Sequence, residues 1–466
     1  MSDGLDHDLV IVGSGPAGMA ASLVAAEHGE RVLVLDEQRQ PGGQVFRAME
    51  KNDAASRPEL GDSYYAGSKL IRSFRRANVD YRPGTTVWHV SSEGEIGFTQ
   101  DGEAKIVKAG HVVVATGAME RPFPVKGWTN AGVMSAGAAQ VLLKEAGIGI
   151  ENAVFAGTGP LLYLVVYQYL QAGIPVKAVL DLTPAENYFA AVRHLPAAIL
   201  SSGKLLRGQK WKRRITRSNI PFLSGIRNIR ICGTGAVNSI EYLVGSTWNK
   251  IETQNVLLHQ GVVPNINISA SAGCDTRWNE RQAAWTVVVD EWFRSSQSRI
   301  SVVGDGAAIG GAVAAQHAGY LAALGALERL GKIDTTIQTK LARAHAVALR
   351  AELRLQPFLE TLFRPARHMR IPVMDDVVVC RCEEIHAGQI REFVGIGCSD
   401  PNQVKSFSRC GMGPCQGRFC GHTVSELIAD IESRPVGEVG YFRLRPPVKP
   451  LRLSELATLS DLPKVD

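Results

Sequence analysis

The feature that most constrains the fold is a glycine turn near the start of the chain, between a short apolar run and an alanine-rich segment. The apolar run covers residues 9–12 and the alanine-rich segment covers residues 19–28. Strand, glycine turn and helix in this order form the phosphate-binding unit of dinucleotide folds. The glycines allow a tight turn and close approach of a pyrophosphate, and the helix N-terminus faces the phosphates. The turn residues expected to bind the nucleotide are Gly13, Gly15, Pro16, Ala17 and Gly18.

A second apolar run, residues 31–35, follows the predicted helix and leads to Asp36 and its neighbour Glu37. In dinucleotide folds, an acidic side chain about 20 residues after the glycine turn accepts a hydrogen bond from a ribose hydroxyl. Strand, helix and acid are all in place, so the sequence predicts a nucleotide site. The motif by itself does not distinguish FAD from NAD.

The same pattern recurs in the middle of the chain, with one departure. Residues 151–162 again indicate a strand, a turn with Gly157 and Gly159, and the start of a helix, and the next acidic strand end is Asp181. The third glycine position holds Leu162, whose side chain should crowd the helix against the strand or hold it further out. We therefore expect a degenerate second fold that does not use NAD(P)H in catalysis. Either an adenine nucleotide occupies it in a structural role, or it is empty.

Length and charge limit the classes of function. A chain of 466 residues predicts two to four domains. The net charge of +6 accompanies no recognisable nucleic-acid-binding module, so nucleic acid is not an expected partner. The basic run over residues 204–217 is interpreted as a solvated face, with a docking surface or anion site as the alternative. The N-terminus lacks the basic region of a secretory signal, and no apolar stretch reaches about 18 residues, so we expect a cytoplasmic protein without a membrane span.

A dense group of cysteines near the C-terminus indicates a metal or iron–sulfur site. Six of the eight cysteines lie there: Cys380, Cys382, Cys398, Cys410, Cys415 and Cys420. In a reducing compartment such cysteines serve chemistry rather than cross-links. Small residues near the thiolates let backbone N–H groups reach the sulfurs, and Gly411, Gly413 and Gly417 supply them. The Cys-x-Cys spacing of the first two cysteines is less typical of zinc pairs, so an iron–sulfur cluster is favoured over structural zinc.

The spacing leaves the set of four ligands open. Cys380 and Cys382 form a natural pair. Cys415 has a cysteine at the same distance on either side, Cys410 before it and Cys420 after it, so either could complete the second pair. Cys398 is interpreted as a packing residue.

Three further segments resemble flavoproteins with two dinucleotide-binding domains, such as the thioredoxin reductase and glutathione reductase groups. These segments are residues 41–44, 111–117 and 299–306. The resemblance implies FAD in the first fold, with the Asp305 carboxylate on the ribityl chain of the flavin. The further FAD residues that it implies are Gly43, Gln44, Ala115, Thr116, Gly117, Gly304 and Asp305.

Residues 411–420 resemble the bacterioferritin-associated ferredoxin-like [2Fe–2S] domain. This resemblance implies the ligands Cys380, Cys382, Cys415 and Cys420, and ranks Cys410 second to Cys420. The implied architecture is an α/β flavoprotein, similar to glutathione reductase, with a small C-terminal [2Fe–2S] domain. The expected divisions are an FAD domain over residues 1–120 and 260–330, an inserted fold over 121–259, a helical linker over 331–374, the [2Fe–2S] domain over 375–435 and a tail over 436–466.

Over nearly its full length the chain resembles the A subunits of bacterial opine oxidases and dehydrogenases. More distant resemblances are to alpha subunits of heteromeric proline and hydroxyproline dehydrogenases, hydrogen cyanide synthase B subunits and part of the sarcosine oxidase alpha subunit. The resemblance implies an electron-transfer subunit of an octopine or nopaline dehydrogenase. It also implies a smaller FAD-containing partner similar to D-amino-acid oxidase, in a heterodimer or larger assembly, with FMN near the subunit interface.

One alternative is a self-sufficient NAD(P)H-dependent flavin reductase that feeds its own cluster. Leu162 and the absence of a Cys-x-x-Cys motif in the inserted fold favour the electron-transfer subunit. The sequence shows no defensible general base, so catalytic residues are not assigned. The histidines considered and interpreted as surface or core residues are His89, His111, His259, His317 and His386.

Overall fold

The structure is a computed structural model that describes residues 5–461, so residues 1–4 and 462–466 of the expected first and last divisions lie outside it. Its first sheet has the order β3-β2-β1-β6-β5-β4, with β19 beside β6. The strands are β1 (His7–Val12), β2 (Val32–Asp36), β3 (Asp80–Pro83), β4 (Thr86–Val90), β5 (Glu95–Gln100), β6 (Glu103–Val114) and β19 (Ile300–Val302). The strands β3, β2, β1, β6 and β19 are parallel, which brings the two expected parts of the FAD domain into one sheet.

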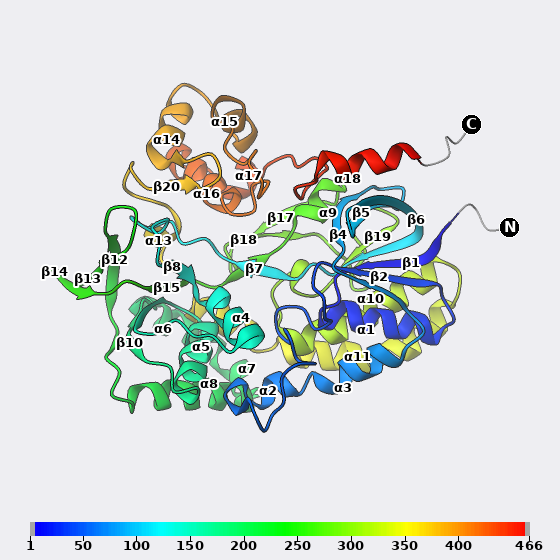
Figure 1. The fold of residues 1–466 in the computed structure, drawn as a ribbon, viewed down its shortest axis with the longest axis horizontal. Helices are drawn as coiled ribbons and strands as arrows, with labels where there is room; N and C mark the ends of the chain where they lie inside the picture. The colour runs from blue at the N-terminus through cyan, green and yellow to red at the C-terminus, as the bar shows by residue number, and fades with distance from the viewer. Residues whose placement is uncertain (1–4, 462–466) are drawn as a thin grey trace.

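Helices cover one side of this sheet, and Figure 1 shows three of them together below β1 and β2. They are α1 (Pro16–Glu27), α10 (Ala312–Arg329) and α11 (Thr335–Leu353), with α3 (Ser68–Arg76) packed on α1. The alanines and glycines of α1 and α10 allow close contact, because a Cβ on Gly319 would lie 2.1 Å from the backbone oxygen of Ala17. This packing fixes the N-terminus of α1 against the sheet.

A second parallel sheet, of order β11-β10-β9-β15-β8, forms the inserted fold. Its strands are β8 (Val133–Ser135), β9 (Ala153–Gly157), β10 (Val176–Asp181), β11 (Phe222–Leu223) and β15 (Val256–His259). Its helices are α4 (Ala136–Ala146), α5 (Pro160–Gln171), α6 (Ala185–Ala191), α7 (Leu195–Ile199) and α8 (Ser202–Thr216). The antiparallel strands β12 (Ile226–Cys232), β13 (Ser239–Val244) and β14 (Thr247–Glu252) complete it.

Two short strands carry the chain between the folds. β7 (Ala118–Glu120) leads into the inserted fold and β16 (Val262–Pro264) leads out of it, and they pair antiparallel. After β16 come α9 (Asn267–Ser271) and the antiparallel pair β17 (Thr276–Asn279) and β18 (Ala284–Val287). The two segments that connect the folds therefore lie side by side.

The loop after the glycine doublet of the first fold, together with α2 (Asp62–Tyr65), links the two folds further. The buried Lys144 ammonium on α4 donates to the backbone oxygens of Gln44 and Val45, at 3.0 Å each. Arg57 donates to the backbone oxygen of Leu143 at 2.6 Å. Burial lowers the pKa of Lys144 to about 7. The inserted fold is thus bonded to the first fold at more places than its two crossing strands.

The C-terminal part begins with α12 (Gln356–Leu362) and α13 (Arg367–Arg370) and forms a small domain, at the top of Figure 1. Its elements are β20 (Val378–Cys380), β21 (Ile385–His386), α14 (Ala387–Gly395), α15 (Pro401–Ser408), α16 (Gly421–Glu432) and α17 (Val436–Val439). The tail then returns to the first sheet, where Val448 N–H donates to the Trp88 backbone oxygen at 3.0 Å and α18 (Leu453–Ala457) packs on β6.

Within residues 5–461, none of the helices combines the length and apolar character required to cross a membrane.

Candidate functional site

The first glycine turn leaves space for a ligand beside Gly15 but none beside Gly18. A Cβ on Gly18 would lie 1.9 Å from the backbone oxygen of Gly13, so this position is closed to any side chain. A Cβ on Gly15 would meet only Gly43, at 3.9 Å. The space beside Gly15 and the N-terminus of α1 suits a pyrophosphate, which dinucleotide folds bind at this point. Gly43 is therefore placed against the turn, as an FAD role requires.

The two acidic residues after β2 have different surroundings. The buried Asp36 carboxylate accepts hydrogen bonds from Ser14 N–H (2.5 Å), the Ser14 hydroxyl (2.6 Å) and Gln38 N–H (2.7 Å). Glu37 is exposed and one of its oxygens lies 2.6 Å from Lys449 Nζ in the tail. Asp36 is therefore occupied in holding the glycine turn, and Glu37 is the better placed of the two to accept a ribose hydroxyl.

The late Gly-Asp segment adjoins the strand end of the first sheet. Asp305 Oδ1 accepts from the N–H groups of Gly310 and Gly311 at 2.8 and 2.9 Å, while Oδ2 has no hydrogen-bond partner among the described residues. Burial raises the pKa of this carboxyl. A Cβ on Gly306 would lie 3.3 Å from Gly117 N, which places the segment next to Ala115–Gly117. A free carboxylate oxygen beside a glycine cradle fits a ribityl hydroxyl of FAD.

Two more of the expected FAD residues have defined contacts. A Cβ on Gly304 would lie 2.9 Å from the Ala17 Cβ, so the late segment touches the start of α1, where Pro16 is the first residue. The Gln44 side chain accepts from Arg47 at 3.0 Å. The residues expected from four separate segments thus meet around one turn.

The inserted fold has its glycine turn but no free acid. Gly157 is the register partner of Asp181, as the motif requires. The Asp181 carboxylate is fully buried and accepts from the Tyr163 hydroxyl (2.9 Å) and from the N–H and hydroxyl of Thr183 (3.1 and 2.6 Å), with Lys212 Nζ at 3.4 Å. Its oxygens are used within the protein, so Asp181 is poorly available to a ribose. Leu162 is fully buried in the first turn of α5.

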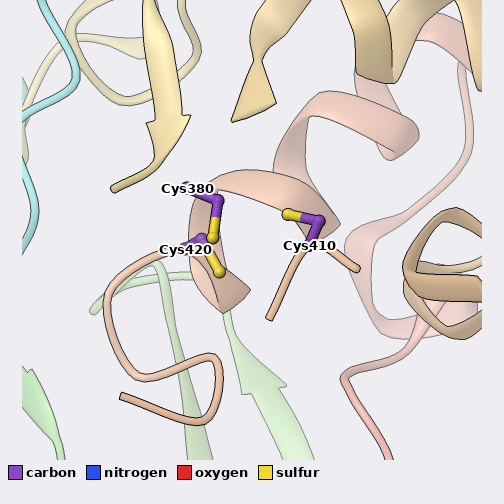
Figure 2. Close-up of side chains that lie close together, drawn as sticks. All are labelled: Cys380, Cys410 and Cys420. Atoms are coloured by element: carbon purple, nitrogen blue, oxygen red, sulfur yellow. The ribbon is translucent and has the colours of Figure 1, made fainter. Parts of the chain in front are cut away.

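Three cysteine thiols converge in the C-terminal domain. The Sγ atoms of Cys380, Cys410 and Cys420 lie within 4.8 Å of one another, and all three residues are buried (Figure 2). Cys380 ends β20, Cys410 follows α15, and Cys420 caps the N-terminus of α16. Hydrogen bonds from the Cys410 and Cys420 thiols lower the pKa of Cys380 to about 2. Sulfurs this close together could hold a metal ion or an iron–sulfur cluster.

Two further cysteines form a pair in the same domain. Burial, together with hydrogen bonding to the exposed Cys382, raises the pKa of the Cys415 thiol, whose charge in turn affects Cys410. A Cβ on Gly413 would lie 2.2 Å from the Cys382 Cβ, so only glycine fits beside this pair.

This arrangement differs from the set implied by resemblance. Cys410, ranked second, lies with Cys380 and Cys420, whereas Cys382 and Cys415 both lie outside that group of three. The spacing could not anticipate this, because Cys410 and Cys420 are equidistant from Cys415 in the sequence. Cys398 is buried in the hydrophobic cluster of the domain and is not one of the three.

A short series of hydrogen bonds joins the flavin-type cradle (residues 115–117 and 304–306) to the cysteine loop (residues 410–420). The Thr116 hydroxyl donates to the Asn265 backbone oxygen, and Asn265 N–H donates to the Gly117 oxygen, both at 3.0 Å. Two residues on, the buried Asn267 side chain donates to the Gln416 backbone oxygen at 2.8 Å. Gln416 follows Cys415, so α9 connects the two predicted redox sites. Local patterns gave no signal for Asn267, because its partner is 149 residues away.

Aromatic side chains cover the cysteine loop. A Cβ on Gly411 or Gly417 would lie 2.7 Å from the Phe442 ring, so only glycine fits beneath it. Tyr441 is half-buried beside Trp285 and His422, with ring centroids 6.0 and 5.8 Å apart, and burial raises its pKa. A dry apolar cover of this kind tunes the potential of a cluster and limits solvent access.

Comparisons with known proteins agree with this geometry. Residues 7–161 match the pyridine nucleotide-disulphide oxidoreductase family, and residues 378–459 match the sarcosine oxidase A3 domain. The A subunit of opine oxidase from Agrobacterium tumefaciens (strain Ach5) is 43% identical over 97% of this chain and 92% of its own length. The corresponding protein of Rhizobium meliloti is 42% identical over 97% and 88%. The HcnB subunit of hydrogen cyanide synthase from Pseudomonas aeruginosa is 28% identical over 97% and 98%.

Solved structures confirm the expected fold class. The crystal structure of L-proline dehydrogenase from P. horikoshii superimposes with a TM-score of 0.71 at 18% identity, over 97% of this chain and 79% of that one. Thioredoxin reductase from T. acidophilum superimposes with a TM-score of 0.50 at 20% identity, over 69% and 97%.

Proposed function

The chain belongs to the family of opine oxidase A subunits, and from this premise we propose that it is the electron-transfer subunit of a heteromeric opine dehydrogenase. It is an oxidoreductase, as its relatives are. Those relatives are named as subunits, which implies a partner protein. In the proposed complex the partner, an FAD-containing subunit similar to D-amino-acid oxidase, oxidises the C–N bond of an opine such as octopine or nopaline, and this chain receives the electrons.

The observation that carries the proposal is the direct connection between the flavin-type cradle and the cysteine loop. Asn267 bonds the loop at Gln416, and its neighbour Asn265 bonds the cradle at Gly117. When bound, FAD would take up electrons in pairs and pass them on singly, because a [2Fe–2S] cluster exchanges them one at a time. The residues between the two sites hold them at a fixed separation, which electron transfer needs.

The proposed cofactor residues follow from the contacts above. FAD is held by the first glycine turn, Glu37, the Gly43 doublet, the Ala115–Gly117 strand end and Asp305, while Asp36 supports the turn. The cluster is held by Cys380, Cys382, Cys415 and Cys420, with Cys410 as the competitor of Cys420. The Cys-x-Cys spacing of Cys380 and Cys382 favours an iron–sulfur centre over zinc, whose paired cysteines are usually about two to four residues apart.

A cavity beside the cysteine loop supports a docking place for the partner. Its volume is about 340 Å³, and its lining includes Glu383, Arg409, Gln416 and Lys449. It lies next to the exposed Cys382, where the domain meets the returning tail. The two cations of the lining are already paired, Arg409 with Glu383 at 3.1 Å and Lys449 with Glu37 at 2.6 Å, so the interfacial FMN is proposed from the resemblance alone.

The division of labour predicts that the isolated chain does not oxidise opines. Hydride transfer from a C–N bond needs a flavin that faces a pocket clamping the substrate carboxylate, and this pocket is assigned to the partner. With an artificial acceptor, the purified chain should show no turnover of octopine, nopaline, proline or glycine, and activity should appear when the partner encoded with it is added. Turnover by the single chain would refute the division. If the complex oxidised proline or glycine but no opine, that amino acid would replace opines as the proposed substrate class.

The alternative, a self-sufficient NAD(P)H-dependent reductase, is favoured only by the second glycine turn. The occupied Asp181 carboxylate and the buried Leu162 count against it, because a ribose acceptor is missing and Leu162 stands where a glycine allows close helix–strand packing. We therefore expect NADH and NADPH to reduce the flavin slowly or not at all. Stopped-flow absorbance at the flavin band checks this, and rapid stoichiometric bleaching by either nucleotide would favour the reductase.

A further inference from the structure

The hydroxyl of Tyr441 lies against the cysteine loop. A Cβ on Gly421, the residue after Cys420, would lie 2.4 Å from the Tyr441 hydroxyl oxygen, so the tip of the ring rests on the Gly421 backbone. The hydroxyl donates to the backbone oxygen of Gly417 at 3.4 Å. Gly417 is the second residue after Cys415. The hydroxyl is therefore next to the backbone that follows each of these two cysteines.

This hydroxyl is only weakly engaged with the protein. O–H···O hydrogen bonds are usually about 2.5 to 3.0 Å long, so a contact of 3.4 Å with the Gly417 oxygen is a weak one. That oxygen is its one hydrogen-bond partner among the described residues. Burial raises the pKa of Tyr441 most, and the charges of Cys420 and Cys415 raise it further, so both thiols lie within electrostatic reach of the hydroxyl. Its hydrogen is available to a sulfur.

Contacts from three elements fix the position of Tyr441. The Ser425 hydroxyl of α16 donates to the backbone oxygen of Gly440 at 2.7 Å. The Asn402 side chain of α15 donates to the backbone oxygen of Tyr441 at 3.3 Å. The Trp285 ring of β18 packs beside the Tyr441 ring, with centroids 6.0 Å apart. Two helices of the small domain and one strand outside it therefore set where the hydroxyl lies.

We propose that the Tyr441 hydroxyl donates a hydrogen bond to the sulfur of Cys415 or Cys420 and thereby raises the reduction potential of the cluster that these cysteines hold. A hydroxyl hydrogen rotates about the C–O bond, so it turns from the Gly417 oxygen to a sulfur without movement of the ring. A donor beside the sulfurs stabilises the reduced, more negative state of a cluster more than its oxidised state. The inference rests on the proposed [2Fe–2S] cluster, and it gives Tyr441 a share in the driving force for electron transfer to that cluster.

The test is the midpoint potential of the cluster in the full chain loaded with FAD and iron, measured by a redox titration followed by electron paramagnetic resonance. Tyr441→Phe removes the hydroxyl and keeps the ring. We expect the equilibrium constant for one-electron reduction to fall ~10-fold, which lowers the potential by about 59 mV. Tyr169→Phe removes a buried hydroxyl from the inserted fold and is the matched control, whose potential should equal that of the wild type.

Iron analysis separates the possible outcomes. Wild-type protein without a cluster would refute the proposed function, and this inference with it. If the wild type holds a cluster, an unchanged or higher potential in iron-loaded Tyr441→Phe would overturn this inference alone. If Tyr441→Phe loses its iron, difluorotyrosine in place of Tyr441 decides, because its more acidic hydroxyl is a stronger donor. The potential should then rise above that of the wild type, and an unchanged or lower potential would overturn the inference.

Discussion

A Gly15→Val variant is expected to fold and to purify without FAD. Gly15 has φ −70° and ψ −178°, a conformation that valine adopts readily, and a Cβ there meets only Gly43 at 3.9 Å. The added methyl groups would then occupy the space that a pyrophosphate needs. We expect FAD affinity to fall at least ~100-fold, which is about 2.8 kcal/mol. Flavin content after desalting and titration with FAD measure this, and thermal unfolding checks that the chain is folded.

Gly18→Val is the matched control for this prediction. Its Cβ would lie 1.9 Å from the Gly13 backbone oxygen, so the helix must move and stability should fall by about 3 kcal/mol or more. The two glycines thus separate loss of cofactor from loss of fold. Full flavin content in folded Gly15→Val would show that FAD does not bind at this turn.

Loss of the cluster in cysteine variants is the second large expected effect. Cys380→Ser should lower iron per chain at least ~10-fold, because Cys380 is one of the three buried thiols whose sulfurs lie within 4.8 Å of one another. Cys420→Ser should do the same, and Cys398→Ser should keep the cluster. Iron analysis and visible absorption of anaerobically purified protein provide the measurement.

Cys410→Ser decides between the two ligand sets. Resemblance to the ferredoxin-like domain predicts that this variant keeps its cluster. The closeness of Cys410 to Cys380 and Cys420 makes it a real competitor. Loss of iron in Cys410→Ser with retention in Cys420→Ser would replace Cys420 by Cys410 in the ligand set. If the cluster survived in Cys380→Ser, the assignment of the cluster to these cysteines would be wrong.

The sequence predicted the features that depend on local patterns. Strand, glycine turn and helix are consecutive at residues 7–27, so the nucleotide fold could be inferred from neighbouring residues. The sequence also identified the cysteines of the C-terminal domain, because only two of the eight cysteines lie elsewhere in the chain. It could not choose between Cys410 and Cys420, since their spacing from Cys415 is the same.

Contacts between distant segments could not be predicted in this way. Ser14 donates two hydrogen bonds to the Asp36 carboxylate, so Glu37 is the more available of the two carboxylates. Only the folded turn shows this. His259 is a core residue, as one of the two interpretations had it, and its hydrogen-bond partner Glu120 is 139 residues away, so local patterns could not predict the pair.

The central claim is that electrons from an opine reach this chain only through its partner. The most direct measurement is anaerobic electron paramagnetic resonance of the reconstituted complex and of the chain alone, frozen after mixing with octopine or nopaline. The account predicts the signal of a reduced [2Fe–2S] cluster in the complex and none in the chain alone. Reduction of the cluster in the isolated chain by the opine, or its failure to be reduced in a complex that turns over substrate, would contradict the account.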